Sequence, residues 1–225
     1  MRRDVLGLSV GRLWLLLVVL CILPPAWAED VLLIVGDSLS AGYGVSREQA
    51  WPGLLERRLE AQKIRVRVVN ASISGETSAS GRARLPGLLQ KHQPRWVLIE
   101  LGANDGLRGL SLDALEANLQ AMQTAVIRAG ATPILAGMRI PPNYGPVYAG
   151  RFAEVFAEPV AGGLRVPFLL DGVAGQPTLN QEDGIHPNAE GQRRVLENVW
   201  QVLQPLFASQ RQVEGKKKTV LDSPK

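Results

Sequence analysis

Cysteine is almost absent from this sequence, and its absence excludes several kinds of chemistry. The 225 residues contain one cysteine, Cys21, within an apolar segment near the N-terminus. Beyond it the chain has no thiol, so a disulfide framework, a cysteine nucleophile and a cysteine-ligated metal site are excluded there. A chain of this length can instead be held together by burial of its apolar side chains alone.

Histidine is nearly as scarce, since the chain carries only His92 and His186. Any reaction that depends on a histidine must therefore use one of these two. Aromatic residues make up 5% of the chain, charged residues 20% and hydrophobic residues 46%. This balance is typical of one globular domain rather than of a disordered or collagen-like chain. The 23 glycines follow no three-residue period, so they indicate turns.

The N-terminal segment has the layout of a secretory signal peptide. Positive charges precede an apolar run of 11 residues at 13–23, and the small-x-small triplet Ala26-Trp27-Ala28 follows. The run is well short of the roughly 20 residues that a membrane-spanning helix needs. We therefore expect cleavage after Ala28, a mature chain that begins at Glu29, and a periplasmic or secreted protein without stable membrane insertion. An uncleaved anchor is the alternative.

Charge is unevenly distributed along the chain. The net charge of +4 looks basic, but three arginines lie in the signal segment, and one arginine and four lysines lie in the tail from Ser209 onward. The residues between hold 17 basic and 18 acidic side chains, so nothing in their balance indicates nucleic acid. The tail, 209–225, lacks apolar periodicity and is expected to be disordered, with attachment to an anionic surface as the alternative. One domain at 29–208 remains.

Between these ends, strand-like apolar runs alternate with helical patterns. Strands are expected at 31–35, 65–69, 96–101, 133–137 and 168–170, and helices at 51–62, 81–90, 112–129, 147–164 and 195–206. This alternation predicts an α/β fold in which helices cover both faces of a parallel sheet. In such sheets the functional residues gather beyond the carboxyl ends of the strands.

Polar turns follow the first three predicted strands. Ser38 comes directly after the first strand, Gly75 lies in the turn after the second, and Asn104 lies in the turn after the third. A glycine N–H and an asparagine amide placed beside a serine can stabilise an oxyanion, although each turn alone is also ordinary turn chemistry. The segment Gly36–Ser40 lacks the final glycine of the G-x-S-x-G elbow, which argues against the usual α/β-hydrolase arrangement.

His186 is the better candidate for a catalytic base. Asp183 stands three residues before it and can orient one ring nitrogen, which leaves the other free to accept a proton. By itself this spacing is more typical of a surface ion pair. His92 lies in a polar turn and is expected to be solvated.

Together these four blocks resemble the GDSL family of lipolytic enzymes, also called SGNH hydrolases. The first block is Gly36-Asp37-Ser38-Leu39, and the last is Asp183-Gly184-Ile185-His186. The likeness runs from Val31 to Leu206 and is strongest with periplasmic bacterial members that hydrolyse acyl-CoA thioesters, lysophospholipids and aryl esters. Ala103 is a small departure, because that group often has glycine there.

The resemblance implies a flavodoxin-like three-layer α/β/α sandwich with five parallel strands, and no metal or organic cofactor. It implies a catalytic triad of Ser38, Asp183 and His186. It also implies an oxyanion hole formed by the backbone N–H groups of Ser38 and Gly75 and by the side chain of Asn104. The resulting hypothesis is a serine hydrolase of esters and thioesters that passes through an acyl-serine intermediate.

The segment 139–146 follows the fourth predicted strand, so it is expected on the rim of the site. The resemblance suggests that it lines an acyl-chain groove, with Ile140 and Tyr144 in contact with substrate; a stiff proline-containing connection is the alternative. We expect a monomer that acts on a small-molecule acyl ester or thioester. Two other functions stay open: a carbohydrate O-deacetylase, and a non-catalytic protein that binds acyl chains or lipids.

Overall fold

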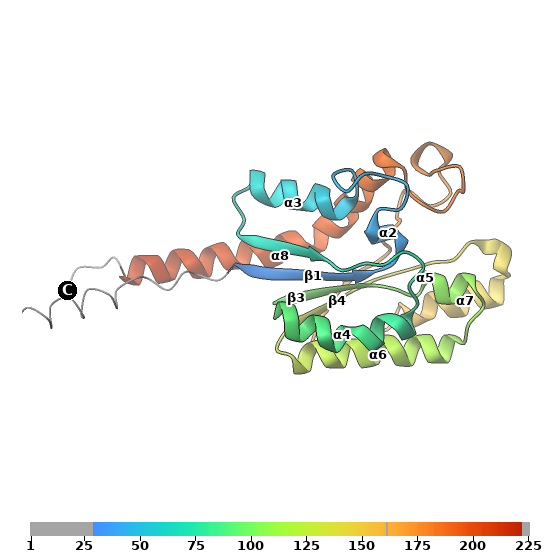
Figure 1. The fold of residues 1–225 in the computed structure, drawn as a ribbon, viewed down its shortest axis with the longest axis horizontal. Coiled ribbons are helices and arrows are strands. Elements are labelled where there is room, and N and C mark those ends of the chain that lie inside the picture. The colour runs from blue at the N-terminus through green and yellow to red at the C-terminus, as the bar shows by residue number, and fades with distance from the viewer. Residues whose placement is uncertain (1–28, 161, 222–225) are drawn as a thin grey trace, which may run out of the picture.

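A five-stranded parallel sheet runs through the centre of the protein (Figure 1). The computed structural model describes residues 29–160 and 162–221, with side chains described up to residue 208. The predicted signal peptide, 1–28, lies outside the described residues. The strands are β1 (Asp30–Gly36), β2 (Val66–Asn70), β3 (Trp96–Glu100), β4 (Thr132–Ala136) and β5 (Leu164–Val166), in the spatial order β2-β1-β3-β4-β5. The sequence-based prediction of a five-stranded α/β fold is confirmed.

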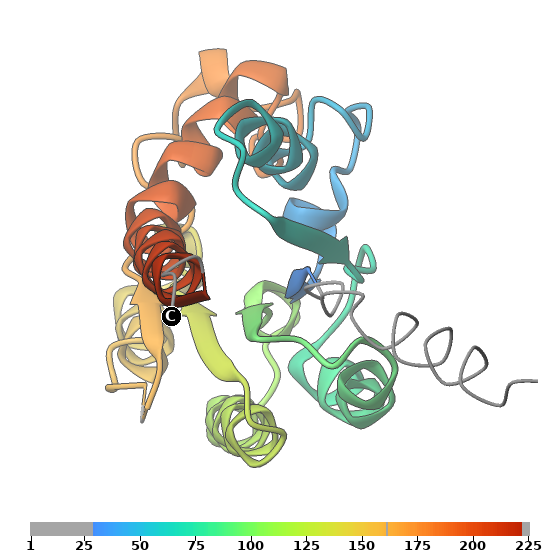
Figure 2. The ribbon, with the colours of Figure 1, turned by 90° about the vertical axis from the view of Figure 1, so that its left-hand side faces the viewer.

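Helices cover both faces of the sheet, as Figures 1 and 2 show. One layer contains α3 (Trp51–Ala61) and α8 (Ala189–Leu221), and the other contains α4 (Ser78–His92), α6 (Leu112–Arg128) and α7 (Pro146–Val155). Two short helices, α2 (Ser38–Ala41) and α5 (Ala103–Leu107), and the 3₁₀ turns η1 (Pro142–Tyr144) and η2 (Pro177–Leu179) complete the described elements. Both α2 and α5 lie at the edge of the sheet where the strands end.

Burial on both faces explains the composition of the central strands. Four consecutive residues of β1, Leu32–Val35, are fully buried, as are Val97, Leu98 and Ile99 of β3. A strand with helices on both sides buries both sets of its alternating side chains, so it is apolar throughout. Glu100, which ends β3, is the one charged residue in this strand. Its carboxyl group is fully buried, like the apolar side chains before it.

Two predicted elements differ from those in the structure. The fifth strand is Leu164–Val166 rather than 168–170, because Pro167 has no N–H to continue the ladder. Phe168 then lies beyond the sheet, at the site. The helix predicted at 147–164 is α7, which ends at Val155; Pro159 follows in a segment that returns to β5.

The helix α8 continues through 209–221, where the sequence pattern predicts a disordered tail. In Figure 1 this part of α8 projects beyond the sheet. Among the described residues, no helix is both long and apolar enough to cross a membrane.

Candidate active site

Ser38 lies at the first turn after β1, whose residues from Val31 to Gly36 are all buried. β1 ends at Gly36, and Ser38 is the first residue of α2. Gly36 is required here, because a Cβ at this position would lie 2.6 Å from Oε2 of Glu100 and 3.0 Å from Oγ of Ser40. Asp37 caps α2 by accepting a hydrogen bond from the N–H of Leu39, at 3.0 Å. The tight turn therefore directs Ser38 out of the sheet edge.

Ser38, His186 and Asp183 form a continuous chain of hydrogen bonds. Oγ of Ser38 lies 2.8 Å from Nε2 of His186, and Nδ1 of His186 lies 2.6 Å from Oδ2 of Asp183. The other oxygen of Asp183 accepts hydrogen bonds from the N–H groups of Ile185 and His186, both at 2.9 Å. With Nδ1 donating to Asp183, Nε2 is free to accept the Ser38 proton.

The environment of Asp183 keeps it ionised. Burial alone raises the pKa of Asp183, but hydrogen bonds from the backbone N–H of His186, from its ring and from the N–H of Ile185 together lower that pKa to about 2. A carboxylate at this place fixes the ring orientation of His186 and stabilises the imidazolium that forms when a proton is accepted.

Gly75 and Asn104 lie at the ends of the neighbouring strands, beside Ser38. Gly75 has a φ of +80°, in the left-handed region that favours glycine. Asn104 belongs to α5, whose capping residue, Gly102, has a φ of +120°. Ser38, Gly75, Asn104 and His186 all line one pocket. The structure thus brings together all five residues predicted from the sequence for the triad and the oxyanion hole.

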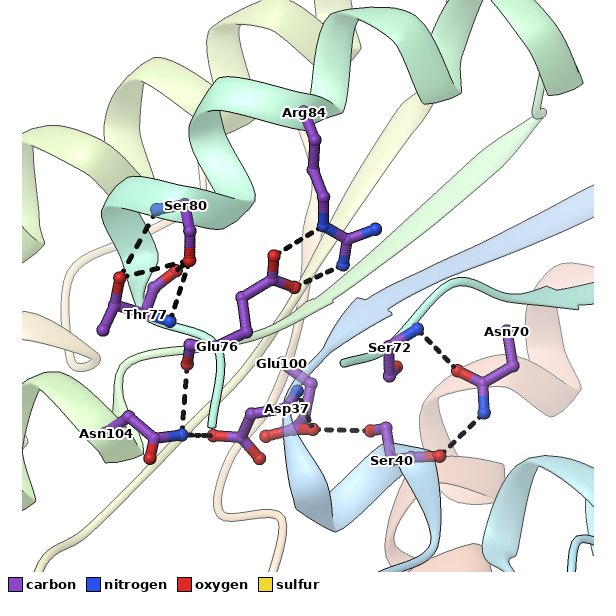
Figure 3. A network of polar contacts seen from close by, with 10 residues as sticks. All are labelled: Asp37, Ser40, Asn70, Ser72, Glu76, Thr77, Ser80, Arg84, Glu100 and Asn104. Carbon is purple, nitrogen blue, oxygen red and sulfur yellow. Dashed lines mark hydrogen bonds and ion pairs between the residues drawn. The ribbon is translucent and has the colours of Figure 1, made fainter. Parts of the chain in front are cut away.

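The Asn104 amide is held from two sides (Figure 3). Its Nδ2 donates to Oδ2 of Asp37 at 3.1 Å and to the backbone carbonyl of Glu76 at 3.1 Å. Glu76 is itself fixed by an ion pair with Arg84 of α4. The guanidinium of Arg108 lies 3.5 Å from Oδ1 of Asn104. These contacts orient the amide with its nitrogen toward the acceptors and its oxygen toward the arginine.

The pocket around Ser38 has a volume of about 780 Å³. Much of its wall is apolar, contributed by Leu39, Leu107, Met138, Ile140, Phe168 and Leu170. A cavity of this size and character suits an acyl chain or another apolar group next to the serine. One rim is formed by Tyr43, whose ring lies 4.6 Å from that of His186.

The structure separates the two predicted substrate contacts. Ile140 lines the pocket. Tyr144 lies beside the pocket instead of in its lining, and its hydroxyl donates to the carbonyl of Leu107 at 3.1 Å. A contact of Tyr144 with substrate stays a prediction, as does that of Ile140. His92 ends α4 ahead of β3, at the opposite edge of the sheet from Ser38.

Several residues of the site were not identified from the sequence. Tyr43 and Phe168 offered no signal, because aromatic residues in loops have many uses. Glu100 carries a signal in the sequence, because it ends the otherwise apolar strand Trp96–Glu100. An acid at the end of a buried strand needs a partner, and Glu100 contacts Asp37 and Ser40 beneath the nucleophile.

Burial and charge set the pKa values of these two acids. Burial raises the pKa of Asp37 to about 6, against the opposing effect of its hydrogen bonds. Burial and the nearby Asp37 raise the pKa of Glu100 well above its usual value. Within the described residues, no group of three or more His, Cys, Asp or Glu side chains could hold a metal ion.

Comparisons with known proteins agree with this geometry. The profile of the GDSL-like Lipase/Acylhydrolase family matches residues 34–194. The chain is 48% identical to Esterase TesA of Pseudomonas aeruginosa over 182 residues, covering 80% of this chain and 90% of that protein. It is 46% identical over 184 residues to Thioesterase 1/protease 1/lysophospholipase L1 of Escherichia coli K12, covering 80% and 86%.

The fold is likewise similar to that of a solved relative. A crystal structure of TesA, 49% identical in sequence, superposes with a TM-score of 0.76 over 79% of this chain and 99% of that one. The similarity therefore extends to the three-dimensional structure and covers nearly all of the solved chain.

Proposed function

The chain belongs to the GDSL-like lipase/acylhydrolase family, and from this membership we propose that it hydrolyses carboxylic esters and thioesters through an acyl-serine intermediate. The observation that carries the proposal is the hydrogen-bonded chain Ser38–His186–Asp183, which opens into an apolar pocket. A non-catalytic acyl-binding protein would have no need for this chain of contacts.

Acylation begins at Ser38. As its Oγ attacks the carbonyl carbon of the substrate, Nε2 of His186 takes the hydroxyl proton over the 2.8 Å contact. The ionised Asp183 stabilises the imidazolium. His186 then protonates the departing alkoxide or thiolate, which leaves the acyl group on Ser38. Water, deprotonated by the same histidine, then attacks the acyl-serine. As the bond from the acyl carbon to Oγ of Ser38 breaks, His186 gives the proton to Oγ, and the acid is released.

The oxyanion formed in each step needs hydrogen-bond donors. The backbone N–H groups of Ser38 and Gly75 and the Nδ2 of Asn104 are assigned this role. Both hydrogens of Asn104 Nδ2 are directed at acceptors in the resting structure, Asp37 and Glu76. One of them must turn or be shared when the oxyanion appears, so this donor acts mainly in the transition state.

The shape of the pocket favours substrates with an apolar acyl group. Its apolar wall begins beside Ser38 and includes Met138, Ile140 and Phe168. The printed names of the relatives, an esterase and a thioesterase/lysophospholipase, describe acyl substrates of the same kind. We propose that the substrates are small-molecule acyl esters and thioesters. The protein is assigned to act as a monomer, after its export from the cytoplasm.

Labelling with a fluorophosphonate tests the reaction class. The wild-type protein is expected to be labelled at Ser38, while Ser38→Ala and heat-unfolded protein are not. Absence of labelling on correctly folded wild-type protein would contradict a serine hydrolase.

A substrate panel then tests the acyl preference. Long-chain acyl-CoA, lysophospholipid, an aryl ester and an acetylated sugar are compared at equal concentration. We expect kcat/KM for the acyl-chain substrates to exceed that for the acetylated sugar. The reverse order would point to a carbohydrate O-deacetylase.

A further inference from the structure

Two buried acids lie side by side beneath the nucleophile. Asp37 and Glu100 are both fully buried, and the backbone N–H of Asp37 donates to Oε2 of Glu100 at 3.2 Å. Figure 3 shows the two carboxyl groups adjacent, with Asn104 on the far side of Asp37. The triad uses neither acid, so their burial requires another explanation.

The oxygens of Glu100 differ in their partners. Oε2 accepts from the N–H of Asp37 and, at 2.6 Å, from the hydroxyl of Ser40. That hydroxyl is in turn held by Nε1–H of Trp51, at 3.2 Å, so its own proton points to Glu100. Oε1 is buried and accepts no hydrogen bond from any described residue. No donor among the described residues stabilises a negative charge on this oxygen. The side-chain hydrogen bond between the two acids raises the pKa of Glu100 while it lowers that of Asp37. Glu100 is therefore the acid of the pair that holds a proton more readily.

Asp37 has the partners of an anion. Its Oδ1 accepts from the N–H of Leu39 and its Oδ2 from Nδ2 of Asn104. No lysine or arginine of the described residues pairs with Asp37 or Glu100, and the basic group that influences Asp37 is His186, without a direct hydrogen bond. Two adjacent buried carboxylates without a counter-ion are too costly, so one of the pair holds a proton.

We propose that Glu100 is a neutral carboxylic acid and that it is a positioning residue for Asn104, the oxyanion donor. With the proton on Glu100, Asp37 remains an anion and can only accept, so it holds the nitrogen of the Asn104 amide. With the proton on Asp37 instead, that acid could donate to the amide oxygen and would oppose the orientation set by the carbonyl of Glu76 and the guanidinium of Arg108. The proton on Glu100 thus keeps Asp37 among the groups that hold the amide nitrogen of Asn104 beside Ser38.

The directions of the two pKa shifts agree with this assignment. Burial raises both, but the pKa of Asp37 reaches only about 6, whereas that of Glu100 is raised further by the neighbouring charge of Asp37. At neutral pH the pair therefore carries one negative charge, on Asp37. The positioning role rests on the proposed function, since it assumes that Asn104 meets an oxyanion. The protonation of Glu100 does not depend on the proposed function.

Two substitutions of Glu100 separate its hydrogen bonds from its charge. Glu100→Gln keeps an acceptor for the N–H of Asp37 and the hydroxyl of Ser40, and keeps a donor in place of the acid proton. We expect its kcat within about threefold of wild type. Glu100→Leu removes every polar contact, and we expect kcat to fall at least about tenfold with KM within about twofold, because the lost interaction acts in the transition state. The control is Val97→Ala, which leaves a cavity beside the same strand without removing a polar contact. This variant is expected to keep its kcat.

Infrared spectroscopy measures the proton directly. With ¹³C-labelled glutamate, the wild-type protein at neutral pH is expected to show the carbonyl band of a protonated carboxylic acid, and Glu100→Gln is expected to lack it. The infrared measurement tests the protonation of Glu100 even if Glu100→Leu does not fold. The proposal is overturned if the band is absent from wild type, if Glu100→Gln loses as much kcat as Glu100→Leu, or if folded Glu100→Leu keeps wild-type kcat. Failure of the proposed function would appear differently, as unlabelled Ser38 with the infrared band still present.

Discussion

Oγ of Ser38 lies 2.8 Å from Nε2 of His186, although the two residues are 148 positions apart in the chain. Ser38 is delivered by the end of β1, and His186 by the loop that precedes α8. Parallel strands end at one edge of the sheet, and the fold uses that edge to bring the two residues together. The contact leads to a first prediction about how they act.

Ser38 and His186 are expected to act as one unit. Ser38→Ala and His186→Ala should each remove nearly all turnover, and the double variant should be scarcely worse than either, because each single change already disables the shared proton transfer. Asp183→Ala should cost less, since the imidazole remains but is poorly oriented. Steady-state kinetics on an aryl ester measures this. His92→Ala, at the far edge of the sheet, is the control; loss of activity there with survival of His186→Ala would show that the base is wrongly assigned.

Removal of the Asn104 amide should affect the rate rather than binding. Asn104→Ala is expected to lower kcat by roughly 10²–10³, the usual effect of one oxyanion donor, with KM nearly unchanged. The matched control is Asn118→Ala on α6, whose side chain bonds to Ser78 outside the pocket. A large rise in KM for Asn104→Ala at constant kcat would instead assign the amide to ground-state binding.

The buried Asp37 should make stability depend on pH. Its pKa is about 6 in the folded protein, mainly because of burial, against 3.8 for an unperturbed aspartate. The folded state thus binds this proton more tightly, so its contribution to stability is fully present below pH 3.8 and is lost as pH rises through about 6. The loss is about 3 kcal/mol at most.

Urea unfolding at several pH values from 3.8 to just above 6 measures this effect. Asp37→Asn removes the titrating group, and the free energy of unfolding of wild type relative to this variant should fall as pH rises. A difference that stays flat or rises across the window would contradict the raised pKa. Asp183 affects a lower window, because its pKa is about 2 and its contribution is lost only below pH 3.8.

The C-terminal segment should be dispensable beyond Phe207. Phe207 is fully buried, with its ring against those of Trp96 and Trp200, so Phe207→Ala is expected to cost about 3–5 kcal/mol. Truncation after Ser209 should leave esterase activity and Tm nearly unchanged, since the removed residues have no apolar periodicity. Thermal unfolding compares the two variants. A marked drop in Tm on truncation would show that 210–225 contributes to the fold.

The N-terminus of the exported protein should be Glu29. The apolar run at 13–23 is too short to span a membrane, and Ala28 ends a typical cleavage triplet. N-terminal sequencing of protein purified from the periplasm tests this. Recovery of Met1, or of a lipid attached to Cys21, would contradict cleavage after Ala28.

Local patterns in the sequence predicted most of the architecture. They failed where pairing between distant segments decides which residues form a strand. The apolar runs of β1 and β3 identify buried parallel strands, because any sheet covered on both faces imposes that composition. The fifth strand was predicted too late in the chain, since Phe168–Leu170 is apolar for a different reason: it contributes to the pocket and to the core around it. Pairing with β4 selects Leu164–Val166 instead, and no local signal reports a partner strand.

The amino-acid sequence by itself determined the family, the five residues proposed for the triad and the oxyanion hole, and the edge of the sheet on which they lie. Those features depend on residue types at fixed places along the chain, after strands whose composition is distinctive. Only the tertiary structure decided that Glu100 lies against Asp37, that the ring of Tyr43 lies beside that of His186 and that the hydroxyl of Tyr144 donates to the carbonyl of Leu107. Such contacts join segments far apart in sequence, and their energies arise from burial, which exists only once the chain has folded.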